Sequence, residues 1–313
     1  MGFLTSLSSV IFDRLSNLLI EKGLEIKLIV SCLIARGHVL LEGVPGVAKT
    51  SMAKSVAKLF SLNFRRVQMT PDLLPLDIVG YYVYDQRTGE FRFKQGPIFT
   101  NILLVDEINR ASPRTQSALL EAMQERQVTI EGSTFKLEEP FLVIATQNPI
   151  EMEGVFPLPE AQLDRFLAKV ETGYLSSNGF KEMLKRIDEI ERGVEELKPV
   201  MSREDLLTLM NRVKEVRVDD SIYDYVVNIV EETRKHPAVK LGGSPRAGIA
   251  MLRLAKAWAL IEGRDYVIPD DVKAVATAAL THRLILKPEY EVEGVTSTQV
   301  INDVLSKVPV PKP

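Results

Sequence analysis

Residues 38–60 place an apolar run, a glycine-rich loop and an amphipathic stretch directly after one another. The run HVLLE has the composition of a buried strand, and KTSMAKSVAKLF has apolar residues at helical spacing. Between them, GVPGVAKT at 43–50 differs from the phosphate-binding pattern G-x-x-x-x-G-K-[ST] only at Ala48, where the pattern has glycine. A strand, loop and helix in this order aim backbone N–H groups at one anion. The segment predicts a parallel α/β sheet with a phosphate-binding loop, and an ordinary strand-to-helix turn is the alternative.

Four more apolar runs continue this pattern, at 64–68, 102–106, 141–146 and 167–171. Helical patterns separate them, so the first half of the chain predicts βαβ units on one parallel sheet. Some of the runs are almost wholly apolar, which is typical of strands that helices cover on both faces. The expected fold is therefore an α/β core built around a parallel sheet.

Two segments inside this core have the alternating pattern of β-hairpins. Residues 81–96 have a turn signal at Thr88-Gly89, and residues 127–137 have one at Glu131-Gly132-Ser133. Both segments are therefore predicted to be antiparallel inserts in an otherwise parallel architecture.

The chain changes character after Tyr174, where strand signals fade and helical patterns dominate. Ser202 with Asp205 resembles a helix N-cap, and so does Pro269-Asp270. A smaller helical domain is thus expected to follow the α/β core. The expected division is a core with both hairpins at 1–175, a linker helix at 176–200 and a helical domain at 201–313.

The glycine-rich loop has chemistry that suits a nucleoside polyphosphate. Gly43 and Gly46 can take positive φ and allow close approach of the backbone, whereas Ala48 is expected near the helix start with negative φ. Lys49 would neutralise the β- and γ-phosphates, and the Thr50 hydroxyl would bind Mg²⁺. The residues expected to contact ATP or ADP are Gly43, Val44, Pro45, Gly46, Val47, Ala48, Lys49, Thr50, Ser51 and Asp106.

Polar side chains follow two of the predicted strands at their carboxyl ends. The run ILLVDEINRAS reaches Asp106 and Glu107, and VIATQNPIE reaches Asn148. Ligands of open parallel sheets bind at this edge, so Asp106 suits a direct or water-mediated Mg²⁺ partner and Glu107 suits polarisation of an attacking water. The amide of Asn148 can orient that water. A solvated strand end and a turn-forming Asn-Pro pair are the structural alternatives.

Two arginines stand where they could reach a bound phosphate. Arg165 follows Asp164 just before the last predicted strand, and Arg246 opens a helix after a Gly-Gly-Ser turn. Added cations stabilise a transferred phosphoryl group, so both are candidate catalytic residues. Ordinary surface salt bridges are the alternative for each.

The composition excludes several other classes of protein. The chain of 313 residues is 45% hydrophobic and 26% charged, which is typical of a globular protein with a sizeable core. Its one cysteine, Cys32, excludes an intrachain disulfide and fits a reducing compartment such as the cytoplasm. A net charge of −3 gives no general attraction to nucleic acid, and no apolar run is long enough to span a bilayer.

Taken together, these motifs resemble those of the AAA+ ATPases, and within them the MoxR family. GVPGVAKT is similar to Walker A, LLVDEINRASPRTQSALLEAMQE to Walker B, ATQNPIE to sensor 1 and GSPRA to sensor 2, while FPLPEAQLDRF contains the family's candidate arginine finger. The motifs occur in the family's order, over roughly residues 10–290. MoxR proteins often have alanine at the position of Ala48, so this departure from the general pattern does not count against nucleotide binding.

The resemblance implies an AAA+ P-loop αβα core, a C-terminal helical lid and Mg-dependent ATP hydrolysis in a homo-oligomer, a hexameric ring with nucleotide at each subunit boundary. The two hairpins would be the helix-2 and pre-sensor-1 inserts. The resemblance implies Mg-ATP binding and hydrolysis by Lys49, Thr50, Asp106 and Glu107. It implies sensor 1 for Asn148 and sensor 2 for Arg246 in the lid. Arg165 would be the arginine finger, which acts in trans, with Arg110 and Arg114 as alternatives.

Several functions are open to such an ATPase. MoxR-like proteins are typically paired with partners that carry a von Willebrand factor A domain, which favours a remodelling or maturation chaperone whose client the sequence does not name. A nucleic-acid motor is disfavoured because the second hairpin, with Arg126 and Lys136 against Glu131 and two further glutamates, is not basic. A magnesium-chelatase-like subunit rests on fold-level analogy alone. A non-hydrolysing switch is disfavoured because Glu107 and Asn148 are both present to handle water.

Overall fold

The computed structural model of the chain describes residues 7–149 and 154–311, and its centre is a parallel sheet of five strands. The strand order is β2-β5-β8-β1-β9. The strands are β1 (Val39–Glu42), β2 (Phe64–Gln68), β5 (Ile102–Asp106), β8 (Leu142–Gln147) and β9 (Ala168–Glu171). Each lies within one residue of a predicted strand, so the sequence prediction of a parallel α/β sheet is confirmed.

Helices cover both faces of this sheet, and strand residues alternate between two hydrophobic cores. On β5, Leu104 packs into the core shared with α2 (Gly23–Ile34) and α3 (Lys49–Leu59). Its neighbours Leu103 and Val105 pack on the other face, in the core that includes residues of α5 (Pro113–Glu125). Because successive strand side chains point to opposite faces, an uninterrupted apolar run is needed in a strand that is buried on both sides.

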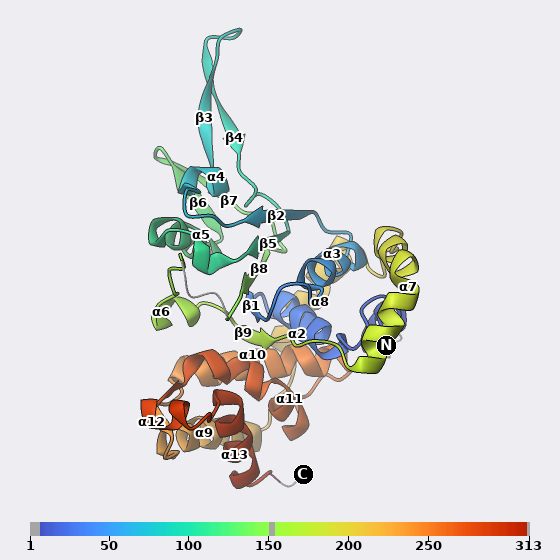
Figure 1. Cartoon of the computed structure of the whole chain (residues 1–313), viewed down its shortest axis with the longest axis vertical. Helices are drawn as coiled ribbons and strands as arrows, with labels where there is room; N and C mark the ends of the chain where they lie inside the picture. Colours follow the sequence, from blue (N-terminus) through green and yellow to red (C-terminus); the bar gives the residue numbers. More distant parts are fainter. Residues whose placement is uncertain (1–6, 150–153, 312–313) are drawn as a thin grey trace.

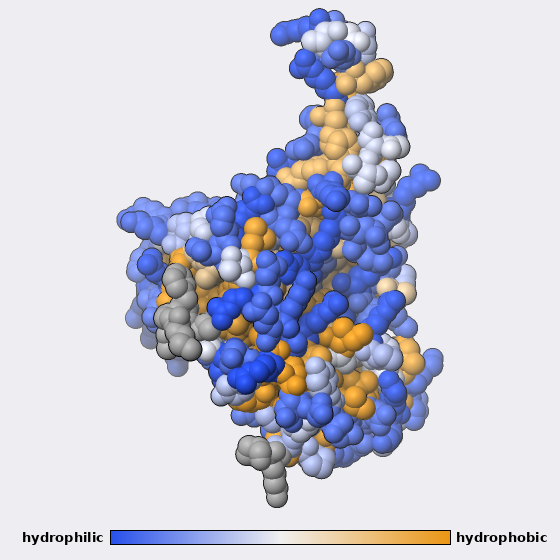
Figure 2. Space-filling model, turned by 180° about the vertical axis from the view of Figure 1, so that it is seen from behind, coloured by the Kyte–Doolittle hydropathy of each residue, from blue (hydrophilic) through white to orange (hydrophobic). Residues whose placement is uncertain are grey.

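Both predicted hairpins are confirmed. The first pairs β3 (Gly80–Asp85) with β4 (Glu90–Gln95), and the second pairs β6 (Gln127–Ile130) with β7 (Ser133–Lys136). The β3–β4 hairpin projects far from the body of the molecule, and the view from behind shows hydrophobic side chains along it (Figures 1 and 2). The bases of the two hairpins meet where the rings of Phe93 and Phe135 stack, with centroids 4.4 Å apart.

The remaining elements are mostly helical. They are α1 (Leu7–Leu15), α4 (Pro75–Val79), α6 (Glu160–Leu163), α7 (Ser177–Glu195), α8 (Arg203–Arg212), α9 (Asp220–Lys235), α10 (Pro245–Ile261), α11 (Pro269–Leu280), α12 (Pro288–Val292) and α13 (Ser297–Lys307), with short 3₁₀ turns at 108–110, 213–215 and 281–283. A small antiparallel pair, β10 (Val239–Leu241) and β11 (Ile285–Leu286), interrupts the helical part, and the sequence patterns do not signal it. Among the helices of the described ranges, none is long and apolar enough to cross a membrane.

One of the two predicted helix caps forms as expected. The Ser202 hydroxyl accepts a hydrogen bond from the Asp205 backbone N–H at 3.1 Å. At α11 the expected cap at Pro269-Asp270 is displaced, because the carboxylate of Asp271 accepts the Ile268 N–H at 2.9 Å while Pro269 forms the first helical residue. Proline suits that position because its missing N–H is not needed there.

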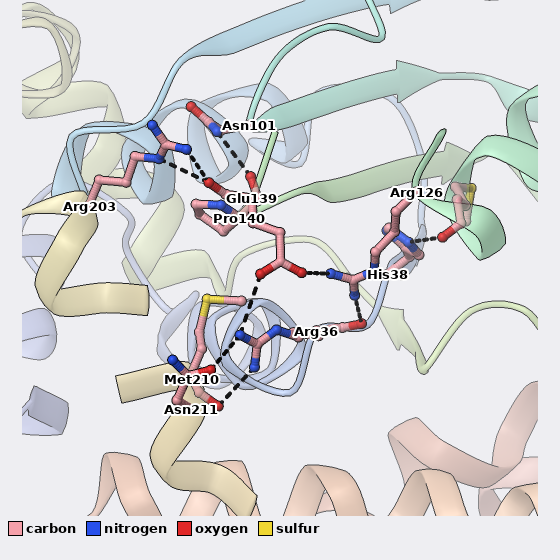
Figure 3. Close-up of polar contacts among 10 residues, drawn as sticks. Arg36, His38, Asn101, Arg126, Glu139, Pro140, Arg203, Met210 and Asn211 are labelled. Carbon is pink, nitrogen blue, oxygen red and sulfur yellow. Dashed lines mark hydrogen bonds and ion pairs between the residues drawn. The ribbon is translucent and has the colours of Figure 1, made fainter. Parts of the chain in front are cut away.

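A cluster of polar contacts around Glu139 joins the first helix after α7 to the core (Figure 3). The Glu139 carboxylate pairs with Arg126 at 2.8 Å and with Arg36 at 3.4 Å. The Glu139 backbone oxygen accepts from Nε of Arg203 on α8 at 2.9 Å, and Arg36 also donates to the Asn211 side-chain oxygen at 2.8 Å. Charge-assisted contacts of this kind fix α8 against the end of α2 and the segment before β8.

Candidate functional site

The glycine-rich loop lies at the carboxyl end of β1, and Lys49 begins α3. The Gly43 N–H donates to the Gln147 carbonyl at 3.2 Å, which fixes the loop to the end of β8. The Lys49 ammonium donates to the Gly43 carbonyl at 2.7 Å, so its side chain folds back over the loop. Thr50 and Ser51 follow in the first turn of α3. The strand, loop and helix therefore adopt the arrangement that an anion site needs.

The two loop glycines are required for different reasons. Gly46 has a φ of +84°, and a Cβ there would meet nothing within 4 Å. A Cβ on Gly43 would lie 2.3 Å from the Thr172 carbonyl oxygen, so this glycine permits close packing against the end of β9. Lys22, which the sequence analysis did not single out, is only 4% exposed and donates to the Thr172 hydroxyl at 3.0 Å and the Gly173 carbonyl at 2.8 Å. This buried ammonium fixes the surface on which the loop packs.

The expected backbone conformation of Ala48 is wrong. Ala48 has φ +64° and ψ 23°, in the left-handed region, and the helix begins only at the next residue. The loop closes its turn at this position, where the pattern G-x-x-x-x-G-K-[ST] has a glycine. An L-residue with a Cβ costs roughly 1–2 kcal/mol in this conformation. The rest of the loop runs from half-buried Val44 through exposed Pro45 to buried Val47.

The acid pair lies at the end of β5 and has partners on both neighbouring strands. Asp106 is 7% exposed, and its carboxylate accepts from the Thr146 hydroxyl on β8 at 3.1 Å and from Nε of Arg66 on β2 at 2.5 Å. The Glu107 backbone N–H donates to the same Thr146 hydroxyl at 2.9 Å. Arg66 and Thr146 were not predicted, since their contacts depend on the order of the strands.

The Glu107 side chain is held at the surface of the site. Its carboxylate accepts from the Gln68 amide at 2.6 Å and from Arg110 at 3.1 Å. The backbone of Glu107 has a φ of +55°, a conformation that is rare for residues other than glycine and tends to occur at functional sites. Asn148 directly follows β8 and is buried. Lys49, the acid pair and Asn148 therefore follow strands β1, β5 and β8, which are neighbours in the sheet.

A cavity of about 1250 Å³ opens beside the loop. It is larger than the 300–1,000 Å³ usual for small-molecule sites and has room for a nucleotide. Part of its wall is apolar, as a purine base would require. The lining includes Gly46, Val47, Ala48, Thr50 and Ser51 from the loop and α3, Lys22 and Tyr174, and Phe180, Met183 and Ile187 from α7.

Two oxygen donors at the carboxyl end of the sheet fit Mg²⁺, and one of them, Thr50, lines the cavity. The Thr50 hydroxyl and the Asp106 carboxylate offer the hard oxygen ligands that Mg²⁺ prefers. Within the described part of the chain, no group of three or more His, Cys, Asp or Glu side chains is arranged to hold a metal ion. Thr50 and Asp106 would therefore hold a Mg²⁺ that the nucleotide brings with it, as this ion usually binds through one or two protein groups and substrate phosphates.

Arg165 and Arg246 lie together at the opposite end of the sheet. Leu167 directly precedes β9, and its N–H donates at 2.8 Å to the carbonyl of His38, which directly precedes β1. The segment that carries Arg165 therefore lies at the amino ends of these strands. Arg246 in the first turn of α10 pairs with Asp164 at 3.1 Å. The residue directly after Asp164 is Arg165, which is exposed. In Figure 1, α6 lies at the left of the sheet, whereas α3 and α7 lie at the right. The structure thus brings Arg246 to the residue beside Arg165, and neither arginine to the loop at 43–50.

The other two candidate arginines follow the acid pair in the chain, and one of them contacts it. Arg110 contacts Glu107 of its own chain, and Arg114 is exposed in the first turn of α5. Arg165 instead lines a small cavity of about 290 Å³ together with Glu121 and Gln124 of α5. All three guanidiniums are therefore on the surface, where a neighbouring molecule could meet them.

Comparisons with known proteins agree with this architecture. Residues 38–168 match the ATPase family associated with various cellular activities (AAA), and residues 231–304 match the AAA lid domain. The chain is 51% identical to the protein YeaC of Bacillus subtilis over 90% of its own length and 88% of the relative. It is 46% identical to Chaperone MoxR1 of Mycobacterium tuberculosis, covering 90% of this chain and 76% of that one.

More distant relatives and a solved structure extend the likeness to nearly the whole chain. Protein MoxR of Methylorubrum extorquens is 30% identical over 95% of this chain and 92% of its own. A crystal structure of a protein from Cytophaga hutchinsonii superposes with a TM-score of 0.89 at 40% identity, covering 98% of this chain and 95% of that one.

Proposed function

Because this chain belongs to the MoxR family of AAA+ ATPases, we propose that it binds Mg-ATP at the loop 43–50 and hydrolyses it to ADP and phosphate. The observation that carries the proposal is that Lys49, the pair Asp106 and Glu107, and Asn148 follow three adjacent strands of the sheet, while the loop at 43–50 also lines a cavity of nucleotide size. Each of these groups can interact with a different part of a polyphosphate or of an attacking water.

The binding half of the proposal follows from the loop geometry. The residues from Gly43 to Ser51 would wrap the phosphates with backbone N–H groups, while the Lys49 ammonium moves from the Gly43 carbonyl to the β- and γ-phosphates. Thr50 and Asp106 would hold the metal. Mg²⁺ held by these two residues would supply positive charge to the phosphates during hydrolysis.

The catalytic half belongs to the side chains beyond the strand ends. Glu107 would polarise the water that attacks the γ-phosphate, and Asn148 would orient it through its amide. The Thr146 hydroxyl, which binds both the Asp106 carboxylate and the Glu107 backbone, would keep the metal ligand and the base in fixed relation. Glu107 must exchange its contacts with Gln68 and Arg110 for the water when it acts.

The remaining cationic groups favour an oligomer. Arg165 and Arg246 lie at the amino end of the sheet, whereas the loop lies at the carboxyl end, and this separation within one chain supports a role at a neighbour's nucleotide. We therefore assign both to the nucleotide of an adjacent subunit in a hexameric ring. The resemblance implies sensor 2 in the lid for Arg246, and the proposal adds that it acts on a neighbour's nucleotide. Arg110 and Arg114 are the alternatives for the arginine finger.

The biological role is proposed from the family. A relative that is 46% identical is named as a chaperone, so ATP hydrolysis in the cytoplasm would drive remodelling or maturation of a partner protein, with a von Willebrand factor A domain protein as companion. In this scheme residues 1–175 form the core, 176–200 the linker and 201–313 the lid, which carries Arg246.

Two variants test the ATPase assignment. Lys49→Ala should lower the affinity for a fluorescent ATP analogue by at least about 100-fold, because the cation at the phosphates is lost. Glu107→Gln should bind the analogue as the unmodified chain does but release phosphate at least about 100-fold more slowly. Lys58→Ala removes another lysine of α3, one that pairs with Glu195 instead, and serves as the control. Unchanged binding by Lys49→Ala would refute the proposal.

A further inference from the structure

Arg66 on the edge strand β2 forms an ion pair with the proposed metal ligand. Its Nε lies 2.5 Å from Oδ2 of Asp106, and Asp106 is the more buried partner, with side chains 51% and 10% exposed. Register places Arg66 opposite Leu104, so the guanidinium leans along the sheet toward Asp106 at the strand end. The contact is therefore specific to this carboxylate and not a result of simple adjacency.

The same arginine is linked to the proposed base. Nη2 of Arg66 donates to the Gln68 side-chain oxygen at 3.3 Å, and the Gln68 amide donates to Glu107 at 2.6 Å. Both acids are thus connected to one cation on β2. The other oxygen of Asp106 accepts from the Thr146 hydroxyl, so Oδ2 is the oxygen whose partner is a charged group.

A guanidinium and a magnesium ion compete for this carboxylate. Nε of Arg66 occupies one lone pair of Oδ2, and the Thr146 hydroxyl occupies one of Oδ1. Mg²⁺, or a water bound to it, needs a further lone pair of Asp106, and the positive charge of Arg66 repels a second cation at the same carboxylate. The guanidinium also compensates a negative charge that would otherwise repel the nucleotide's phosphates. Removing Arg66 should therefore have opposite effects on nucleotide binding with and without metal.

We propose that Arg66 is a positioning residue that competes with Mg²⁺ for Asp106 and so sets how strongly metal and nucleotide binding are coupled. The inference rests on the proposed function, because it takes Asp106 as the Mg²⁺ partner. Release of Arg66 by the metal also ends its hold on Gln68, which is one of the two side chains that bind Glu107. Binding of Mg²⁺ at Asp106 would then also make the Glu107 side chain more mobile.

The test measures the affinity of the full chain for a fluorescent ADP analogue, once in excess EDTA and once over a titration of Mg²⁺. In Arg66→Met the affinity in EDTA should fall, and the Mg²⁺ concentration at half-maximal enhancement should drop. Half-exposed ion pairs are worth up to about 1 kcal/mol, so the ratio of the affinities with and without Mg²⁺ should rise about three- to fivefold. Arg66→Lys keeps the charge and should lie between Arg66→Met and the unmodified chain.

Arg65→Met is the matched control. Arg65 is the adjacent residue of β2 and donates to the Gly96 carbonyl instead of to the acids, so its loss should leave the ratio unchanged. A ratio in Arg66→Met that is equal to or below that of Arg65→Met overturns the inference, because a merely structural loss weakens both affinities together. If the unmodified chain binds no analogue under either condition, the proposed function itself fails, and this result is distinguishable from an unchanged ratio.

Discussion

Arg246 on α10 donates to the Asp164 carboxylate at 3.1 Å, and Asp164 is the residue directly before Arg165. The other carboxylate oxygen accepts from Nε of buried Arg283 at 2.7 Å, and Arg283 also donates to the Phe166 carbonyl at 2.8 Å. Asp164 thus ties the first turn of α10 to the segment that carries Arg165. A displacement of α10 would therefore move both candidate arginines together.

The first prediction concerns Arg165. Arg165→Ala should lower the rate of phosphate release by about 10³-fold, because an arginine that stabilises the transferred phosphoryl group has an effect of this order. Mixing it with the inactive Glu107→Gln chain should restore part of the turnover. In a mixed ring, the site of an Arg165→Ala subunit keeps Glu107 and receives Arg165 from its neighbour. Lack of recovery in rings verified to be mixed would move the role to Arg110 or Arg114.

The same mixing experiment decides between the two possible actions of Arg246. If Arg246 acts on a neighbour, Arg246→Ala mixed with Glu107→Gln should also regain turnover. If it acts on its own subunit's nucleotide, each site in the mixed ring lacks one group, and turnover stays lost. Arg253→Ala, an exposed position further along α10, should leave phosphate release unchanged and controls for general effects on the helix.

The two glycines of the loop should respond differently to the same substitution. Gly43→Ala should lower nucleotide affinity by about tenfold or more, because its Cβ would stand 2.3 Å from the Thr172 carbonyl and the loop must shift. Gly46→Ala meets no atom of the chain within 4 Å, so in the nucleotide-free protein it should cost only the backbone strain of a positive φ, roughly 1–2 kcal/mol of stability. Gly43→Ala should lose more stability than this in the nucleotide-free protein, and equal losses in the free energy of unfolding of the two variants would contradict the distinction.

Local patterns were enough to predict the five strands, both hairpins and the acid pair. Apolar runs and turn residues act within a few positions of the chain, and the fold preserves them as the sequence suggests. The partners of the acids could not be found in this way. Arg66 and Gln68 reach Asp106 and Glu107 only because β2 lies beside β5 in the sheet, and the order of parallel strands is set by crossovers that leave no mark in the strands themselves.

Two further features depend on geometry that a pattern does not contain. The sequence places Ala48 beside a helix, but the turn needs one left-handed residue before that helix can start, and Ala48 provides it. The sequence also places Arg246 at a helix start without saying which end of the sheet that helix meets. The ion pair with Asp164 settles the position of this side chain, and only the packing of α10 against the core produces it.

The left-handed conformation of Ala48 predicts that Ala48→Gly stabilises the chain. Glycine removes the Cβ strain at φ +64°, and part of that gain is lost to the greater entropy of the unfolded chain. The expected net gain in the free energy of unfolding is about 0.5–1 kcal/mol, measured by urea titration. Ala53→Gly within α3 is the matched control and should lose about 1 kcal/mol, because that alanine is helical and buried. A loss of similar size in both variants would contradict the strain argument.

His38 should make the fold less stable in acid. Burial lowers the pKa of His38 to about 4, although its hydrogen bond to the Met123 carbonyl opposes this in part. Nδ1 accepts from the Val143 N–H at 3.0 Å, so the proton of the neutral ring is on Nε2, which faces the Met123 carbonyl. A second proton would break the contact with Val143. The folded chain therefore keeps His38 neutral, whereas the unfolded chain protonates it below its ordinary pKa of about 6.5.

As pH falls, the unfolded state takes up this proton before the folded state does. The contribution of neutral His38 to the free energy of unfolding is therefore fully present above pH 6.5 and is lost as pH falls toward 4. At pH 5 the free energy of unfolding should be about 2 kcal/mol lower than at pH 7.5 from this group alone. His38→Gln lacks the titration and should show a smaller drop over the same interval, even if it is less stable throughout. His282, whose pKa is also lowered by burial, adds a drop of the same sign in both chains. Identical pH dependence in the two proteins would rule out His38 as its source.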